Sequence, residues 1–155
     1  MNEYPQLLAE AVEAVLAKWL VGCVMNTARR AGYPHSDQLL ADARHMAQSA
    51  APVVQREMNE LLATDVDAQR SNPLSVLRSA VRYPTSVLRA AGVTPPQRGD
   101  FSLRSFPDDI YDLSPAAWAD VDESLQEPGL IWGAWKAKTV LNRRNQRDTP
   151  QDQGE

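Results

Sequence analysis

The sequence predicts an all-α protein: a small helical bundle with an irregular aromatic and acidic strap and a C-terminal helix. Composition is the first reason, because the 155 residues include 21 alanines but only 7 glycines and 2 isoleucines, which favours helix over strand. Spacing is the second, since the N-terminal apolar residues recur every three or four positions. The third is that capping residues, prolines and glycines stand where helices of ordinary length would begin and end.

Composition also limits the class of protein. An apolar fraction of 43% and a charged fraction of 23% exclude a fully disordered or collagenous chain. The length suits one helical domain, expected over residues 1–145, followed by a flexible tail at residues 146–155. The single cysteine, Cys23, cannot form a disulfide within the chain, which fits a cytoplasmic protein. Residues 7–25 carry too many charges for a membrane span, so no membrane is expected as a partner.

The first helix is expected over residues 5–31, with Pro5 in its first turn and Gly32 after its end. Its apolar residues form one wide stripe: Leu8, Val12, Val15, Leu16, Trp19, Cys23 and Val24. Such a stripe makes this helix either the central helix of the domain or one half of a dimer seam. We favour the central helix, because apolar helices usually pack within their own domain.

A second helix is expected over residues 37–50, with Ser36 as its N-cap. Pro52 removes a backbone donor, so we expect a short break there and a third helix from Val53 onward.

An eleven-residue repeat comes next, in which residues 73–80 and 84–91 share the pattern Pro-x-Ser-Val-Leu-Arg-x-Ala. Each copy predicts a short helix with proline at its first position, and Gly92 ends the second copy. Tyr83 precedes Pro84, which disfavours helical dihedral angles at Tyr83. We therefore expect two short helices that meet at an angle.

The strap, residues 92–127, is rich in proline and in aromatic residues. Ser114 and Pro115 are expected to cap and open a short helical turn through Trp118. The apolar residues of the strap should hold it against the helices: Phe101, Phe106, Ile110, Tyr111, Leu113 and Trp118. A last helix is then expected over residues 130–144.

Charge is distributed in blocks along the chain. Residues 68–99 contain five arginines and no acid, residues 108–127 contain seven acids and no base, and residues 128–147 have a net charge of +5. Two interpretations stay open. The acidic strap folds over the basic blocks and neutralises them, which we favour because the blocks are adjacent, or the arginines face outward and bind phosphate or an acidic partner.

The arginine block supplies one candidate site. Arg78, Arg82 and Arg89 could contact phosphates, and Tyr83 could stack on a base. The acidic isoelectric point of about 5.2 and the absence of a nucleic-acid-binding motif argue against nucleic acid as the partner.

The acidic cluster of Asp108, Asp109 and Asp112 could line a pocket for acid–base catalysis or hold a hard cation. The glycine and terminal glutamate of a calcium loop are absent, so neither a metal nor a cofactor is expected. Cys23 lies in the most apolar helix, where thiols are usually inert, and His45 is interpreted as a surface or boundary residue, so no catalytic residue is assigned.

Aromatic residues are concentrated toward the C-terminus. Trp118, Trp132 and Trp135 could anchor a protein partner, because tryptophan is common among interface residues that dominate binding. Packing within the domain is the other interpretation, and we favour it.

Two stretches of the sequence carry a resemblance. They are residues 64–92, with the repeat, and residues 106–133, with Phe-Pro-Asp-Asp, Tyr-Asp-Leu-Ser-Pro and Glu-Pro-Gly-Leu. In texture they resemble a family of small, uncharacterised actinobacterial proteins, and the bias of 13 arginines to 3 lysines suits a bacterial genome rich in G and C. The resemblance implies no activity.

Together these observations predict a non-catalytic cytoplasmic interaction or regulatory protein, whose partner is another protein or a second copy of itself in a homodimer. One alternative is a nucleic-acid or phosphate-ligand binder that uses the arginine face. Another is an enzyme with a carboxylate-lined pocket.

Overall fold

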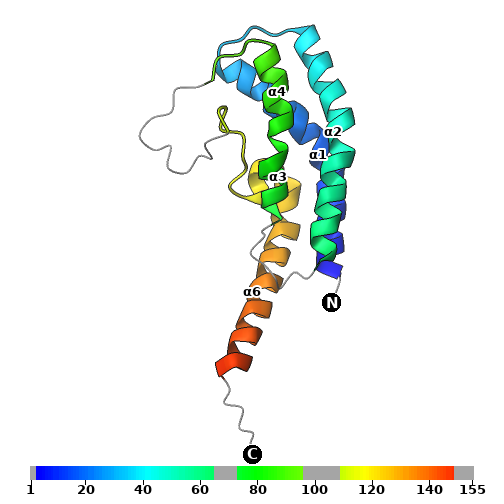
Figure 1. Cartoon of the computed structure of the whole chain (residues 1–155), viewed down its shortest axis with the longest axis vertical. Helices are drawn as coiled ribbons and strands as arrows, with labels where there is room; N and C mark the ends of the chain where they lie inside the picture. The colour runs from blue at the N-terminus through cyan, green and yellow to red at the C-terminus, as the bar shows by residue number, and fades with distance from the viewer. Residues whose placement is uncertain (1–2, 65–72, 96–108, 149–155) are drawn as a thin grey trace, which may run out of the picture.

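The computed structural model describes residues 3–64, 73–95 and 109–148, and these contain helices and connecting segments but no strand. The all-α prediction is confirmed. Figure 1 shows the arrangement of the helices. In chain order they are α1 (Glu3–Arg30), α2 (Asp37–Ala63), α3 (Leu74–Ala80), α4 (Arg82–Ala90), α5 (Trp118–Val121), the 3-10 helix η3 (Glu123–Leu125) and α6 (Gln126–Asp148).

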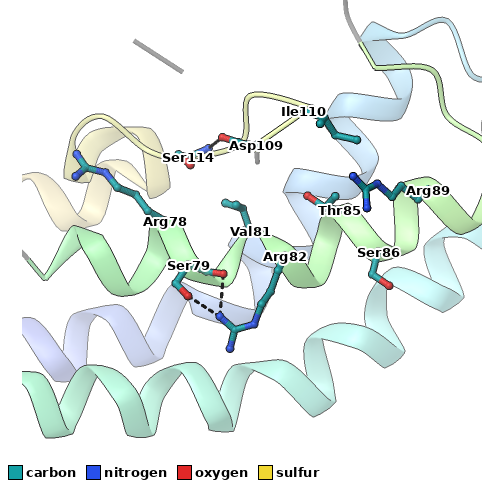
Figure 2. A pocket seen from close by; sticks show the side chains of 10 residues that line it. All are labelled: Arg78, Ser79, Val81, Arg82, Thr85, Ser86, Arg89, Asp109, Ile110 and Ser114. Atoms are coloured by element: carbon teal, nitrogen blue, oxygen red, sulfur yellow. Dashed lines mark hydrogen bonds between the residues drawn. The ribbon is translucent and has the colours of Figure 1, made fainter. Parts of the chain in front are cut away.

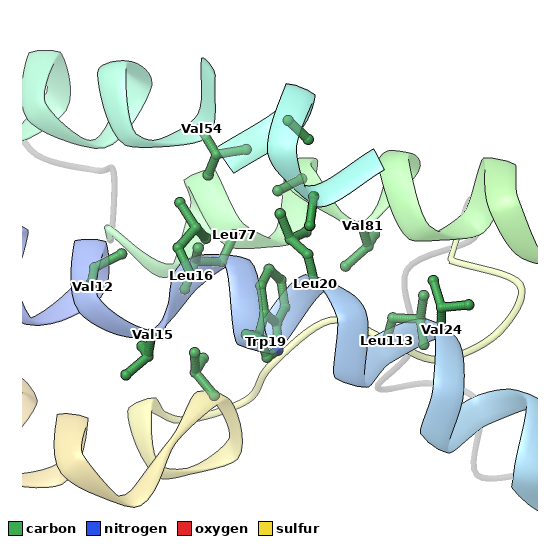
Figure 3. Close-up of a cluster of buried hydrophobic side chains, with 14 of the residues drawn as sticks. Val12, Val15, Leu16, Trp19, Leu20, Val24, Val54, Leu77, Val81 and Leu113 are labelled. Atoms are coloured by element: carbon green, nitrogen blue, oxygen red, sulfur yellow. The ribbon is translucent and has the colours of Figure 1, made fainter. Parts of the chain in front are cut away.

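Helix α1 is the central helix of the fold. It contacts α2, α4 and α6, and its apolar stripe lies inside the resulting core. Leu16 and Leu20 are at most 1% exposed, and Figure 3 shows them on the side of α1 that faces Val54 of α2 and Leu77 of α3. Gly32 ends α1 with a φ of 78°, which lets the Tyr33 amide donate a hydrogen bond to the Ala28 carbonyl at 2.8 Å.

Helix α2 runs unbroken through Pro52, so the predicted break there is wrong. Ser36 is the N-cap, as expected, and its side chain accepts a hydrogen bond from the Leu39 amide at 3.2 Å. The proline ring is exposed, whereas Ala50 and Val54 on either side of it are buried against the core. A break would expose this buried stripe, and we infer that its burial outweighs the one backbone hydrogen bond that proline removes.

Helices α3 and α4 follow one another end to end, as Figure 1 shows, instead of turning at Tyr83. The interruption is at Val81, which keeps helical dihedral angles of −63° and −15°. Pro84 lies in the first turn of α4, where a missing amide hydrogen costs no helical bond, so Tyr83 can be helical. Gly92 ends α4 as predicted, with a φ of 75°.

The described part of the strap packs on the helices, as its aromatic residues predicted, while Phe101 and Phe106 lie outside the described residues. Tyr111 is 2% exposed, and its hydroxyl donates a hydrogen bond to the Val93 carbonyl at 2.6 Å. The turn predicted at Ser114 begins later, at Trp118. The Asp120 carboxylate accepts hydrogen bonds from the amides of residues 116 and 117 at 2.9 Å each, which places the start of α5 after them.

Helix α6 begins at Gln126 and continues to Asp148, past the position where a flexible tail was expected. Pro128 and Gly129 belong to its first turn, where proline is tolerated. A Cβ atom at Gly129 would overlap the side chain of Trp118, so glycine is what lets that indole lie against the helix. Figure 1 shows the C-terminal half of α6 projecting beyond α1 to α4.

Candidate functional site

A cleft of about 790 Å³ lies between the α3–α4 pair and the described part of the strap. Three of the residues that line it are Arg78, Arg82 and Arg89, and we call it the arginine cleft. Because α3 and α4 run end to end, positions 78, 82, 85 and 89 recur at steps of four, three and four residues and fall on one side. All three predicted arginines line this cleft, but Figure 2 shows that the Arg82 side chain points toward α2 while those of Arg78 and Arg89 point toward the strap.

Arg82 is engaged with its own neighbourhood. Its guanidinium donates hydrogen bonds to the carbonyl and hydroxyl oxygens of Ser79, and it lies 3.6 Å from a carboxylate oxygen of Glu57 on α2. It also lies 4.6 Å from the centre of the Tyr83 ring and donates to the Tyr83 hydroxyl at 3.1 Å. Tyr83 thus stacks on Arg82 rather than presenting a free ring face on that side.

Arg89 has a different environment. It is exposed, and among the described residues it forms no ion pair with any carboxylate. Its charge is felt by Tyr111, whose pKa is raised by burial and lowered, to a smaller extent, by Arg89. Arg89 therefore contributes a positive charge to the cleft without a protein counter-ion in the described part of the chain.

Two hydroxyl groups line the cleft from its opposite walls. Thr85 of α4 is 7% exposed and Ser114 belongs to the strap. The side-chain oxygens of both are buried, and neither has a hydrogen-bond partner among the residues that the structure describes. A buried hydroxyl without a partner loses the hydrogen bonds that water would supply, so a polar ligand that reached either group would restore a hydrogen bond.

Asp109 also lines the arginine cleft, but its carboxylate is already bound. The residue is 2% exposed, and its two oxygens accept the amide hydrogens of Leu113 at 2.8 Å and Ser114 at 2.7 Å. Asp109 therefore shapes the strap. Neither Arg82 nor Arg89 pairs with a strap acid in the described ranges, whereas Asp122 of the strap pairs with Lys18 of α1 at 3.4 Å.

The two described residues of the acidic cluster, Asp109 and Asp112, line different hollows. Asp108 lies outside the described residues, and Asp112 is exposed, with a φ of 56°, beside a separate hollow of about 310 Å³. Asp122 lines the same hollow, and its pKa is held below the ordinary value by the hydrogen bond from the Ser124 amide, with a contribution from Lys18. Within residues 3–64, 73–95 and 109–148 no cluster of metal-ligating side chains is found.

Cys23 lines this second hollow, and its thiol is expected to be unreactive. Burial raises the pKa of Cys23 to about 12, the negative charge of Asp109 adds to the rise, and Arg30 opposes it. The thiol is therefore protonated at neutral pH and is a poor nucleophile. His45 is exposed on α2.

The three tryptophans pack α6 against the rest of the fold. Trp132 is 3% exposed, and its ring centre lies 5.2 Å from that of the partly buried Trp135. Trp118 covers Gly129. Since Trp132 belongs to the core, it is not available as an exposed anchor in this structure.

The opposite face of α6 carries apolar residues that the sequence-based prediction missed. Leu130 is 66% exposed and Leu141 is 55% exposed, and Ala134 and Ala137 lie between them on the same face. We call these four residues the outer stripe. Their spacing of four, three and four residues is the signal that could have identified it, although the tryptophans of the other face dominate the apolar pattern of this segment.

No helix among the described residues has both the length and the apolar composition needed to cross a membrane. Comparison with family models, with curated proteins and with solved structures finds no match to this chain. The arginine cleft and the outer stripe are two features of the described residues that can support a function.

Proposed function

We propose that this protein is a non-catalytic interaction protein of the cytoplasm that associates with a second copy of itself through the outer stripe of α6. The observation that carries the proposal is the exposure of Leu130 and Leu141 on a helix that projects from the bundle. The single, free cysteine supports the cytoplasmic setting, since it cannot form a disulfide within the chain.

The order of residues in the outer stripe supports a second copy as the occupant. Read from either end, the stripe is leucine, alanine, alanine, leucine. In an antiparallel pair, Leu130 of one copy would therefore lie against Leu141 of the other, and Ala134 against Ala137. The two alanines allow the helices to approach closely at the centre, while the leucines fill the space at both ends.

Charge supports the same antiparallel register. Glu127 stands three residues before Leu130, and Arg144 stands three residues after Leu141. In the antiparallel pair each glutamate would thus face an arginine of the other copy, whereas a parallel pair would place like charges together. Both residues are exposed.

The small size of the interface sets the expected affinity of the dimer. The stripe covers about 17 Å of helix, at 1.5 Å per residue, which is small for a protein interface. We therefore expect a reversible dimer with a dissociation constant in the micromolar range, roughly 1–100 μM.

Sedimentation velocity over that concentration range tests the proposal. The parent should pass from monomer to dimer, and Leu141→Glu should stay monomeric because a charge enters the apolar contact. Asn142→Glu is the matched control, since it adds the same charge at an exposed neighbour outside the stripe, and it should dimerise like the parent. A parent that is monomeric throughout, or a Leu141→Glu variant that dimerises normally, would contradict the proposal.

A charge exchange tests the register. Glu127→Lys and Arg144→Glu should each weaken the dimer, by about two- to fivefold for an exposed pair. The double variant should recover most of the affinity, because the opposite charges face one another again. If the double variant is weaker than either single variant, the antiparallel register is wrong.

A further inference from the structure

We propose that the arginine cleft binds the phosphoryl group of a small phosphorylated molecule. The site lies on α3, α4 and the strap, away from the outer stripe of α6, so it does not depend on self-association. It is built from three kinds of group: guanidinium, hydroxyl and apolar side chain.

Arg89 supplies the positive charge for the anion. It lies on the same side of the α3–α4 pair as Arg78, and both line the cleft, as Figure 2 shows. Guanidinium groups present paired N–H donors that match the oxygens of a phosphate. The Arg82 side chain points away from the strap, toward α2, where it contacts Glu57, so it contributes less to anion binding than Arg89 does.

Thr85 supplies a hydroxyl group that is independent of the arginines. Its side chain is more than nine-tenths buried, and its hydroxyl points into the cleft with no partner among the described residues. Ser114 offers a second such hydroxyl from the strap wall. Hydroxyl donors beside guanidinium groups are a common way to complete the coordination of phosphate oxygens.

The acid at the cleft does not oppose anion binding strongly. Both carboxylate oxygens of Asp109 accept hydrogen bonds from backbone amides of the strap, and these donors offset part of the negative charge of the carboxylate. Arg89, which pairs with no carboxylate in the described part of the chain, therefore faces one carboxylate of the cleft lining, and that carboxylate is bound internally.

The size and apolar wall favour a small molecule over a nucleic acid. A volume of about 790 Å³ lies in the range of pockets for metabolite-sized ligands, and Val81 and Ile110 offer a surface for an uncharged body. Arg82 already stacks on the ring of Tyr83, so one face of the ring is not free to stack on a base. The net charge of −4 on the whole chain also weakens attraction to a polyanion.

Titration calorimetry with phenyl phosphate tests the proposal, with inorganic phosphate, benzyl alcohol and a ten-residue oligothymidine as comparison probes. We expect phenyl phosphate to bind more tightly than inorganic phosphate and benzyl alcohol not to bind. Raising the salt concentration should weaken binding, because the contact is between charges. Tighter binding of the oligothymidine than of phenyl phosphate would overturn the small-molecule assignment, and binding of none of the anions would overturn the site.

Variants locate the site. Arg89→Ala should weaken phenyl phosphate binding at least about tenfold, whereas Arg44→Ala, which removes an exposed arginine of α2, should leave it unchanged. Thr85→Val keeps the shape of the side chain and should weaken binding about three- to tenfold. Because this variant removes a buried hydroxyl without a partner, its melting temperature should stay equal or rise, which excludes misfolding as the cause.

The result is separable from self-association. The monomeric Leu141→Glu variant should bind phenyl phosphate as the parent does, and Arg89→Ala should dimerise as the parent does. Equal affinity of the parent and Arg89→Ala for phenyl phosphate would show that the anion binds elsewhere and would overturn the assignment.

Discussion

Helices α1 and α6 carry similar apolar patterns and have opposite surroundings. In both, apolar residues recur every three or four positions, yet Leu20 of α1 is fully buried while Leu141 of α6 is 55% exposed. The sequence allows α1 to be a dimer seam, but the structure encloses it between α2, α4 and α6. Periodicity therefore identifies a stripe, but the helices that surround it decide whether the stripe is core or surface.

The same substitution in the two helices should have opposite consequences. Leu20→Ala should lower the free energy of unfolding by about 2–5 kcal/mol, because it leaves a cavity in the core. Leu141→Ala should change the free energy of unfolding of the monomer by about 0.5 kcal/mol or less. Urea denaturation at a protein concentration well below the dissociation constant of the dimer, where the monomer dominates, measures both.

The dimer provides the second half of this test. Leu141→Ala should weaken self-association, whereas Leu20→Ala should leave it unchanged as long as the protein is folded. If Leu141→Ala lost several kcal/mol of monomer stability, α6 would be packed more closely than its exposure indicates and the contrast between the helices would fail.

The two faces of α6 also differ in whether they are packed, and substitutions at two of its glycines should measure this difference. Gly129→Ala should lower the free energy of unfolding by about 1–3 kcal/mol, because the new methyl group overlaps the side chain of Trp118. Gly133→Ala meets no atom within 4 Å and should raise it by up to about 1 kcal/mol through helix propensity. Thermal denaturation of both variants gives the comparison, and a tolerated Gly129→Ala would show that Trp118 can move at little cost.

Much of the fold was predictable because its signals are local. The Ser36 cap, the glycines after α1 and α4 and the stripe of α1 each act within a few residues, and the structure confirms them. The packing of the strap on the helices was predictable because large aromatic side chains such as that of Tyr111 are usually buried.

The predictions fail where tertiary packing outweighs a local rule. Pro52 is tolerated within α2 because the residues around it are buried against the core. That burial depends on where α1 lies, which the sequence around Pro52 alone cannot predict. The same reason applies to the candidate site. The block of arginines in the sequence indicated the candidate site. The contact of Arg82 with Glu57, however, joins residues of different helices, and the unpartnered hydroxyl of Thr85 depends on where the strap runs.

The smallest expected effect concerns the enclosed surroundings of α1. The pKa of Cys23 is about 12 in the folded protein, against an ordinary value of 9.0, so between these two values the unfolded chain loses a proton that the folded chain keeps. Stability should therefore fall as pH rises through this interval, with the contribution of Cys23 amounting to about 1 kcal/mol at pH 10 relative to pH 7.

Cys23→Ala isolates this contribution, because every other group that titrates in the interval is common to both proteins. The difference in unfolding free energy between the parent and Cys23→Ala should shrink by about 1 kcal/mol from pH 7 to pH 10, since only the parent has the thiol. Denaturant unfolding at the two pH values measures it. If the difference stayed constant, water would reach the thiol in the folded state. Helix α1 would then be more exposed at Cys23 than the comparison with α6 assumes.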